Sequence, residues 1–146
     1  MVLFGHSMGA RIALESWAFD SSRIAGMILA DFAVDGTVTE NEREGRAQRV
    51  KGAHANGMSS LLESWLKPMV AEGFDGNERF NELADMVLNE TPDSHEQQIQ
   101  ALLDRPNAEI YLKEIRCATL LLVGEEDGWS EAQSFSAHRV EKRKEK

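Results

Sequence analysis

Three short apolar runs, separated by segments with helical periodicity, limit the fold of this chain more than any other feature. The runs lie at residues 1–5, 24–30 and 117–124, and each ends near a glycine or an acidic residue. Runs that are apolar throughout are typical of parallel strands, which pair only when a long connection, usually a helix, joins them. We therefore predict an α/β fold with about three parallel strands and flanking helices.

Helical patterns fill most of the sequence between and after these runs. Helices are predicted over these segments: 10–19, 39–52, 58–69, 77–88, 94–103 and 130–143. The second is expected to be a polar helix, and the capping-box pair Ser130 and Gln133 indicates the sixth. The other four have apolar residues at helical spacing. Asp93 or Ser94 is the expected N-cap of the fifth helix, and Pro68 should end or kink the third.

The length and the distribution of polar residues favour a single domain with an insertion. A chain of 146 residues is close to one domain. The composition changes after the second apolar run, since residues 35–57 contain four glycines and many charges. We expect a core of residues 1–34 and 115–146, interrupted by a helical insertion over residues 35–114.

The charge balance argues against two classes of partner. The chain has 16 Lys and Arg against 25 Asp and Glu, for a formal net charge of −9. Residues 139–146 hold five bases and two acids, so residues 1–138 carry −12. We expect no nucleic-acid partner and no docking on an anionic membrane, because both need clustered Lys and Arg.

Other absences in the sequence favour a cytoplasmic protein. No apolar run approaches the roughly 20 residues that span a bilayer, and no basic start followed by an apolar segment indicates a signal peptide. Cys117 is the only cysteine, which excludes an internal disulfide and a CxxC-type zinc site.

A Gly-x-Ser-x-Gly motif, Gly5-His6-Ser7-Met8-Gly9, lies directly between the first predicted strand and the first predicted helix. In this context the turn is tight and holds the serine in a strained backbone conformation. We expect that side chains at Gly5 and Gly9 would clash, so that both positions need glycine. The Met8 N–H would then lie at a helix N-terminus, where it can stabilise an oxyanion.

Three segments resemble the α/β-hydrolase superfamily. VLFGHSMGARIALE resembles its nucleophile elbow, IAGMILADF its next strand, and IRCATLLLVGEEDGWS the strand that ends in the acid of its catalytic triad. Residues 35–114 fall where that family inserts a helical cap. The resemblance implies a serine hydrolase for a small ester-like or amide-like substrate, with an acyl-enzyme on Ser7. It assigns Asp127 as the triad acid and the Met8 N–H as an oxyanion donor, and it implies no metal or organic cofactor.

Alternatives remain for the acid and for the substrate pocket. Glu126 would be the acid if the register were shifted by one residue, and Asp31 ends the second strand at the same sheet edge. His6 is expected to pack beside the site. Trp129 would border the pocket or pack under the cap. Trp65 and the other apolar residues of the third helix either line the pocket or form an ordinary helix–helix core, which we favour.

The position of the triad histidine is the main departure from the family pattern. In that family the histidine follows the acid after a further helix and strand. Only His138 lies downstream, about eight residues into the last predicted helix and hence roughly 12 Å from the sheet edge. His54 and His95 lie in the insertion and are expected to be exposed. The resemblance therefore predicts a chain truncated at both ends, without the triad histidine and one oxyanion donor.

Two other functions remain open at this stage. The chain is either such a hydrolase or a catalytically inactive fragment or interaction remnant, with self-association through exposed sheet edges. A third hypothesis is a helical module that binds a partner through the acidic residues of segment 72–96. That segment holds eight acids and one base, Arg79, but such runs are usually solvated surface.

Overall fold

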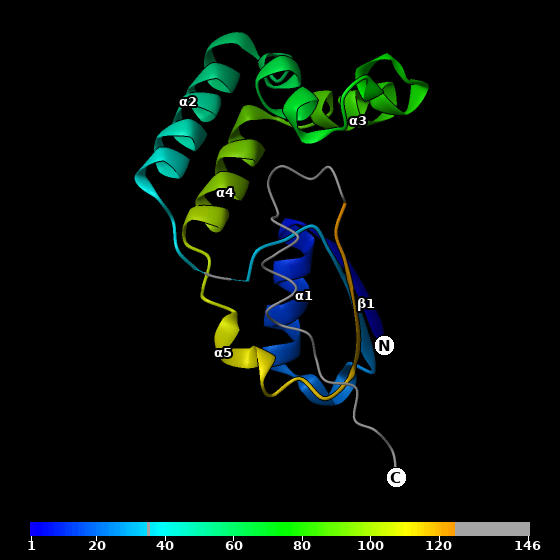
Figure 1. The fold of residues 1–146 in the computed structure, drawn as a ribbon. Helices are drawn as coiled ribbons and strands as arrows, with labels where there is room; N and C mark the ends of the chain where they lie inside the picture. Colours follow the sequence, from blue (N-terminus) through cyan, green and yellow to red (C-terminus); the bar gives the residue numbers. More distant parts are fainter. Residues whose placement is uncertain (35, 125–146) are drawn as a thin grey trace. The chain divides into compact units, whose positions relative to one another are not determined.

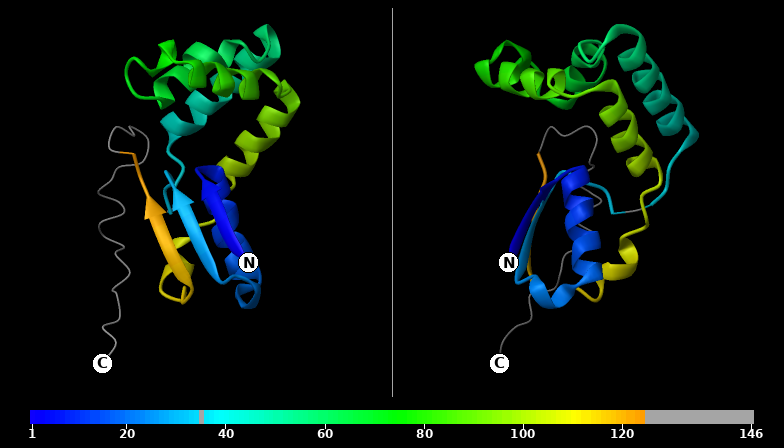
Figure 2. Two further views of the ribbon diagram at one scale, coloured as in Figure 1. Left: turned by 90° about the vertical axis from the view of Figure 1, so that its right-hand side faces the viewer. Right: turned by 180° about the vertical axis from the view of Figure 1, so that it is seen from behind.

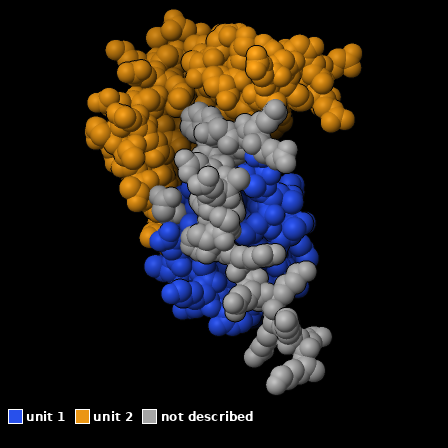
Figure 3. All heavy atoms as spheres, viewed as in Figure 1, with its two compact units in different colours: residues 1–34, 108–146 blue, residues 35–107 orange. Residues whose placement is uncertain are grey.

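The computed structural model describes residues 1–34 and 36–124, and the chain divides into two compact units (Figure 3). Unit 1 comprises residues 1–34 and 108–146, and unit 2 comprises residues 35–107. The helices and strands of unit 1 are β1 (Val2–His6), α1 (Met8–Phe19), η1 (Ser21–Arg23), β2 (Gly26–Ala30), α5 (Glu109–Leu112) and β3 (Ala118–Leu122). Those of unit 2 are α2 (Glu40–Asn56), η2 (Leu62–Leu66), η3 (Lys67–Met69), η4 (Phe74–Gly76), α3 (Glu78–Leu88) and α4 (Pro92–Leu103).

Unit 1 is built on a three-stranded parallel sheet in the order β1-β2-β3, which confirms the predicted α/β class (Figures 1 and 2). The central strand β2 is the second strand in the sequence. Ala30 at the end of β2 pairs with His6 of β1 on one side and with Leu122 of β3 on the other. The carboxyl ends of all three strands therefore meet at one edge.

The two faces of this sheet differ in burial. On one face, α1 packs through Ala10, Ala13, Leu14 and Trp17, which are buried with Met27, Leu29 and Phe32 in the unit 1 core. On the other face, Phe4 and Leu120 flank Ile28 in one row and are 71% and 52% exposed. The apolar runs of β1 and β3 thus alternate between a covered and an uncovered side.

The boundary of the helical insertion differs from the expected one. Ala108 is buried in the unit 1 core, and its N–H donates to the Val34 carbonyl at 3.0 Å. The Tyr111 hydroxyl of α5 reaches Glu15 of α1 at 3.5 Å. Residues 108–114, expected in the insertion, therefore belong to unit 1.

Unit 2 is helical, but one predicted helix is irregular. The segment expected as an amphipathic helix over 58–69 contains a π-helical turn, η2, followed by the 3₁₀ turn η3. Pro68 lies in η3 and has no N–H for an α-helical bond, which is a sufficient reason for the helix to end there. Leu66 is buried and Trp65 partly buried in the unit 2 core, as favoured from the spacing.

The start of α4 corrects another expectation. Neither Asp93 nor Ser94 is the N-cap. The cap is Thr91, whose hydroxyl accepts the Ser94 N–H at 3.1 Å. Pro92 occupies the first helical position, where a missing N–H removes no intrahelical bond. The Thr-Pro pair was the better signal for this helix start.

His95 is buried rather than exposed. Its exposed fraction is 5%, and its ring lies 6.1 Å from that of Trp65. It occupies the same face of α4 as Ile99, which is also buried, because residues four apart share a helix face. Burial, and then the positive charges of Arg46 and Arg49, lower the pKa of His95 below its ordinary value.

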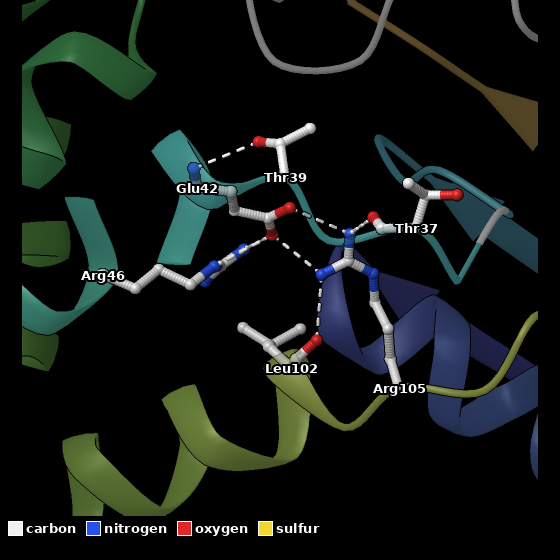
Figure 4. A network of polar contacts seen from close by, with 6 residues as sticks. All are labelled: Thr37, Thr39, Glu42, Arg46, Leu102 and Arg105. Carbon is white, nitrogen blue, oxygen red and sulfur yellow. Dashed lines mark hydrogen bonds and ion pairs between the residues drawn. The ribbon is translucent and has the colours of Figure 1, made fainter. Parts of the chain in front are cut away.

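A polar network joins the start and the end of unit 2 (Figure 4). Arg105 donates from Nη1 and Nη2 to the two carboxylate oxygens of Glu42, at 2.7 and 3.0 Å, and also bonds the carbonyls of Leu102 and Thr37. Arg46 donates to the same carboxylate at 3.0 Å. Burial alone would raise the pKa of Glu42, but the hydrogen bonds and charges of the two arginines outweigh it and lower that pKa.

Candidate active site

Ser7 occupies the turn between the end of β1 and the start of α1. Its φ is +51°, in the left-handed region that few residues other than glycine adopt. The Ser7 N–H donates to the Ala30 carbonyl at 2.8 Å, and the Ser7 carbonyl accepts the Ala10 N–H at 3.1 Å. The first bond holds the turn to the end of β2 and the second to α1. The structure thus gives Ser7 the strained conformation that the motif predicts.

The two motif glycines differ in how strictly they are needed. A Cβ on Gly5 would lie 2.3 Å from the Gly9 carbonyl oxygen, so β1 and α1 can approach this closely only with glycine there. A Cβ on Gly9 would meet no atom of the described residues within 4 Å. The expectation that both positions need glycine for steric reasons is therefore wrong for Gly9, whose side-chain direction is open.

The groups that would perform the chemistry are positioned by the backbone. Met8 is the first residue of α1, and among the described residues its N–H donates to no carbonyl. Such first-turn N–H groups, at the positive end of the helix dipole, favour a negative charge. Within the described part of the chain, the Ser7 hydroxyl has no hydrogen-bond partner. The turn therefore presents the Ser7 hydroxyl beside a backbone N–H that has no carbonyl partner among the described residues.

His6 and Asp31 form a pair at the same sheet edge. His6 Nε2 lies 3.4 Å from Asp31 Oδ2, and the His6 side chain is 59% exposed. The Gly124 N–H donates to Asp31 Oδ1 at 2.9 Å, and the Asp31 N–H donates to the Leu122 carbonyl at 3.0 Å. The sequence placed His6 beside the site and Asp31 at a strand end. The link from Asp31 to Gly124 was not foreseen, because it joins residues 93 positions apart.

Asp127, Trp129, Glu126 and His138 lie outside the described residues. Trp65 lies in unit 2, where it packs against that unit's core. Its role in a substrate pocket stays a prediction.

A possible metal-binding group occurs elsewhere, in unit 2. Within residues 36–124, His54, Asp93 and Glu96 bring one ligand atom each to within 4.8 Å of one another. All three are exposed, and His54 Nε2 already pairs with Glu96 Oε2 at 2.8 Å. Ion pairs of this kind are common on helix surfaces, and we assign no metal to this group.

None of the described helices is both long and apolar enough to cross a membrane.

Comparison with known proteins gives structural neighbours only. No family model and no curated protein matches the sequence. A thermophilic esterase from Thermogutta terrifontis matches with a TM-score of 0.83 at 24% identity, over 94% of this chain and 51% of the esterase. A carboxylesterase of Nitrososphaera gargenis matches with a TM-score of 0.75 at 17% identity, over 94% and 51%. The chain has the α/β-hydrolase fold. MenH from S. aureus, at 27% identity and a TM-score of 0.60, matches over 94% of this chain and 53% of MenH.

This chain spans about half the length of the α/β-hydrolase structures that it matches. The α/β-hydrolase fold explains why the serine turn and the ends of β2 and β3 meet, because sites in parallel sheets assemble at the carboxyl ends of the strands. In the chain, unit 2 is a helical insertion between β2 and β3. Fold alone does not assign a reaction, which depends on the site.

Proposed function

We propose that this chain carries the nucleophile of a serine hydrolase that cleaves a small ester-like or amide-like substrate. The observation that carries the proposal is the backbone of Ser7, with φ +51° between β1 and the first turn of α1. A nucleophile elbow has this strand–turn–helix context. The esterases among the structural neighbours support an ester as the first substrate class to test.

The proposed reaction proceeds through an acyl-enzyme. Ser7 Oγ attacks the substrate carbonyl carbon while a base takes the hydroxyl proton, and the Met8 N–H stabilises the oxyanion. Collapse of the tetrahedral intermediate breaks the bond to the leaving group, which receives that proton. Water then attacks the acyl-enzyme in the same way and releases the acid. We assign Asp127 the role of orienting the base.

None of the described histidines forms a hydrogen bond with the Ser7 hydroxyl. His54 and His95 belong to unit 2, where His54 pairs with Glu96 and His95 is buried beside Trp65. His6 pairs with Asp31. We propose that the histidine that activates Ser7 is supplied from outside the described residues, by His138 or by a second copy of this chain.

Covalent labelling tests the proposal most directly. We expect a fluorophosphonate probe to label the purified chain and to leave Ser7→Ala unlabelled, because only an activated serine reacts rapidly with it. Ser16→Ala is the matched control, since the Ser16 hydroxyl bonds the Ile12 carbonyl at 2.7 Å within α1. Labelling that persists in Ser7→Ala would contradict the assignment.

A non-catalytic remnant that self-associates is the second candidate. The exposed apolar side chains on the open face of the sheet, including Phe4 and Leu120, favour it. This candidate predicts no labelling of a folded chain, together with a mass that rises with concentration in size-exclusion chromatography with light scattering. A labelled monomer would exclude it.

A further inference from the structure

Both carboxylate oxygens of Asp31 are engaged at the edge where the nucleophile lies. Oδ1 accepts the Gly124 N–H at 2.9 Å, and Oδ2 lies 3.4 Å from His6 Nε2. The side chain is 29% exposed, so water screens these contacts only in part. One carboxylate therefore bridges the residue that precedes Ser7 and the segment that follows β3.

The backbone around Asp31 is fixed to the same two neighbours. The Ala30 carbonyl accepts the Ser7 N–H on one side, and the Asp31 N–H donates to the Leu122 carbonyl on the other. Asp31 itself has a φ of +47°, which aspartate adopts more readily than most residues but still at some energetic disadvantage. The surrounding bonds must maintain this conformation, which aims the carboxylate along the sheet edge.

We propose that Asp31 is a positioning residue that sets the distance between the nucleophile turn and residues 123 and 124, which directly follow β3. Gly124 is three residues before Asp127 in the sequence, and His6 directly precedes Ser7. The inference rests on the proposed function, since it gives Asp31 a role in the reactivity of Ser7. It differs from a triad acid, because Asp31 acts through His6 and Gly124 rather than on the reacting atoms.

Two substitutions separate the carboxylate from the backbone that carries it. Asp31→Gly removes the side chain and tolerates the positive φ. Asp31→Asn also tolerates that φ, keeps an oxygen acceptor for the Gly124 N–H, and offers an amide donor to His6 in place of Oδ2. Asp85→Asn is the matched control, because Asp85 is an exposed residue of α3 in unit 2.

The readouts are the rate constant of Ser7 labelling and the exchange protection of the Gly124 amide, measured by NMR on the folded variants. We expect Asp31→Gly to lower the rate constant roughly tenfold or more, since small displacements of reacting groups have large effects on rate. Asp31→Asn should recover most of the loss, and Asp85→Asn should label like the wild type. The Gly124 amide should be protected in the wild type and in Asp31→Asn, and unprotected in Asp31→Gly.

Each result has a distinct meaning. A wild type that is not labelled overturns the proposed function and this inference with it. A labelled wild type with Asp31→Gly within about twofold of its rate constant overturns the inference alone. So does an Asp31→Asn variant as slow as Asp31→Gly, because the role would then not be hydrogen-bonded positioning. Should Asp31→Gly fail to fold, an unprotected Gly124 amide in the wild type would still overturn the inference.

Discussion

The two units join segments that are distant in the sequence by different means. In unit 1, the ends of the three strands are held mainly by backbone bonds, from the Ser7 N–H to Ala30 and from the Asp31 N–H to Leu122. In unit 2, the ends are held by charged side chains, with Arg105 and Glu42 paired across 63 positions. Main-chain bonds thus join most of the strand ends in the unit with the candidate nucleophile, and ionised side chains join the two ends of the helical unit.

This difference has consequences for how each unit responds to change. Backbone hydrogen bonds do not titrate near neutral pH. An added side-chain atom, however, clashes where two backbone segments are in direct contact. A network of side chains loses stability by steps as partners are removed or protonated. A single steric substitution in unit 1 should therefore cause a large loss in the free energy of unfolding. In unit 2 the free energy of unfolding should fall in smaller steps as charges are removed or the pH is lowered.

Gly5→Ala should have the largest effect. The added Cβ would lie 2.3 Å from the Gly9 carbonyl oxygen, so β1 and α1 must separate. We expect the free energy of unfolding of unit 1 to fall by at least about 3 kcal/mol, measured by urea denaturation followed through the buried Trp17.

Gly9→Ala is the matched control for that substitution. Within residues 1–34 and 36–124 its Cβ meets nothing within 4 Å, and alanine is the better helix former, so stability should rise by up to about 1 kcal/mol. Equal losses in the two variants would show that the close approach at Gly5 does not decide the fold of the turn.

Glu42→Gln should have an intermediate effect, confined to unit 2. It weakens the charge-assisted bonds from Arg105 and Arg46, and we expect a loss of about 1–2 kcal/mol at pH 7, reduced by solvent screening of the partly exposed carboxylate. Because the folded pKa of Glu42 is lowered from 4.5, its stabilisation is present above pH 4.5 and is lost as the pH falls through the folded value. The difference in the free energy of unfolding between Glu42→Gln and the wild type should therefore shrink as the pH falls.

The control for this variant is Glu44→Gln, one of the exposed acids of α2. It should change the free energy of unfolding by no more than about 0.5 kcal/mol. A loss in Glu44→Gln equal to that in Glu42→Gln would mean that net charge, and not the paired network, stabilises unit 2.

His95→Leu should have the smallest effect at pH 7 and should appear mainly as a change in the pH dependence of stability. Burial and nearby arginines lower the folded pKa of His95 from 6.5, so the unfolded chain takes up a proton first as the pH falls below 6.5. Through this residue, the free energy of unfolding of the wild type should then fall by at most about 1.4 kcal/mol for each unit by which the pH is lowered.

The measurement is urea denaturation of the wild type and His95→Leu at a series of pH values between 7 and 5, spanning the ordinary value of 6.5. The variant lacks the titrating group and also removes Nε2, which is buried and has no hydrogen-bond partner in the part of the chain that the structure describes. Parallel stability curves for the two proteins would show that His95 titrates alike in the folded and unfolded states.

The features that could be predicted from the sequence are those with local signals. Apolar runs fixed the three strands, and the position of Gly5 and Ser7 between a strand and a helix predicted the strained turn. Two of the expectations that failed depended on partners far along the chain. The burial of His95 depends on the packing of α4 against Trp65, and the inclusion of residues 108–114 in unit 1 depends on Val34 and Glu15.

The sequence by itself determined the parallel strands, the serine turn and the helical insertion, because these follow from periodicity, from glycine and from short-range hydrogen bonding. The tertiary structure alone decided which residues meet at the sheet edge. It brought Asp31 to Gly124 and His6, and it showed that Gly5 is sterically required while Gly9 is not. These facts depend on the spacing between elements to within a fraction of an ångström, which no local pattern of residues encodes.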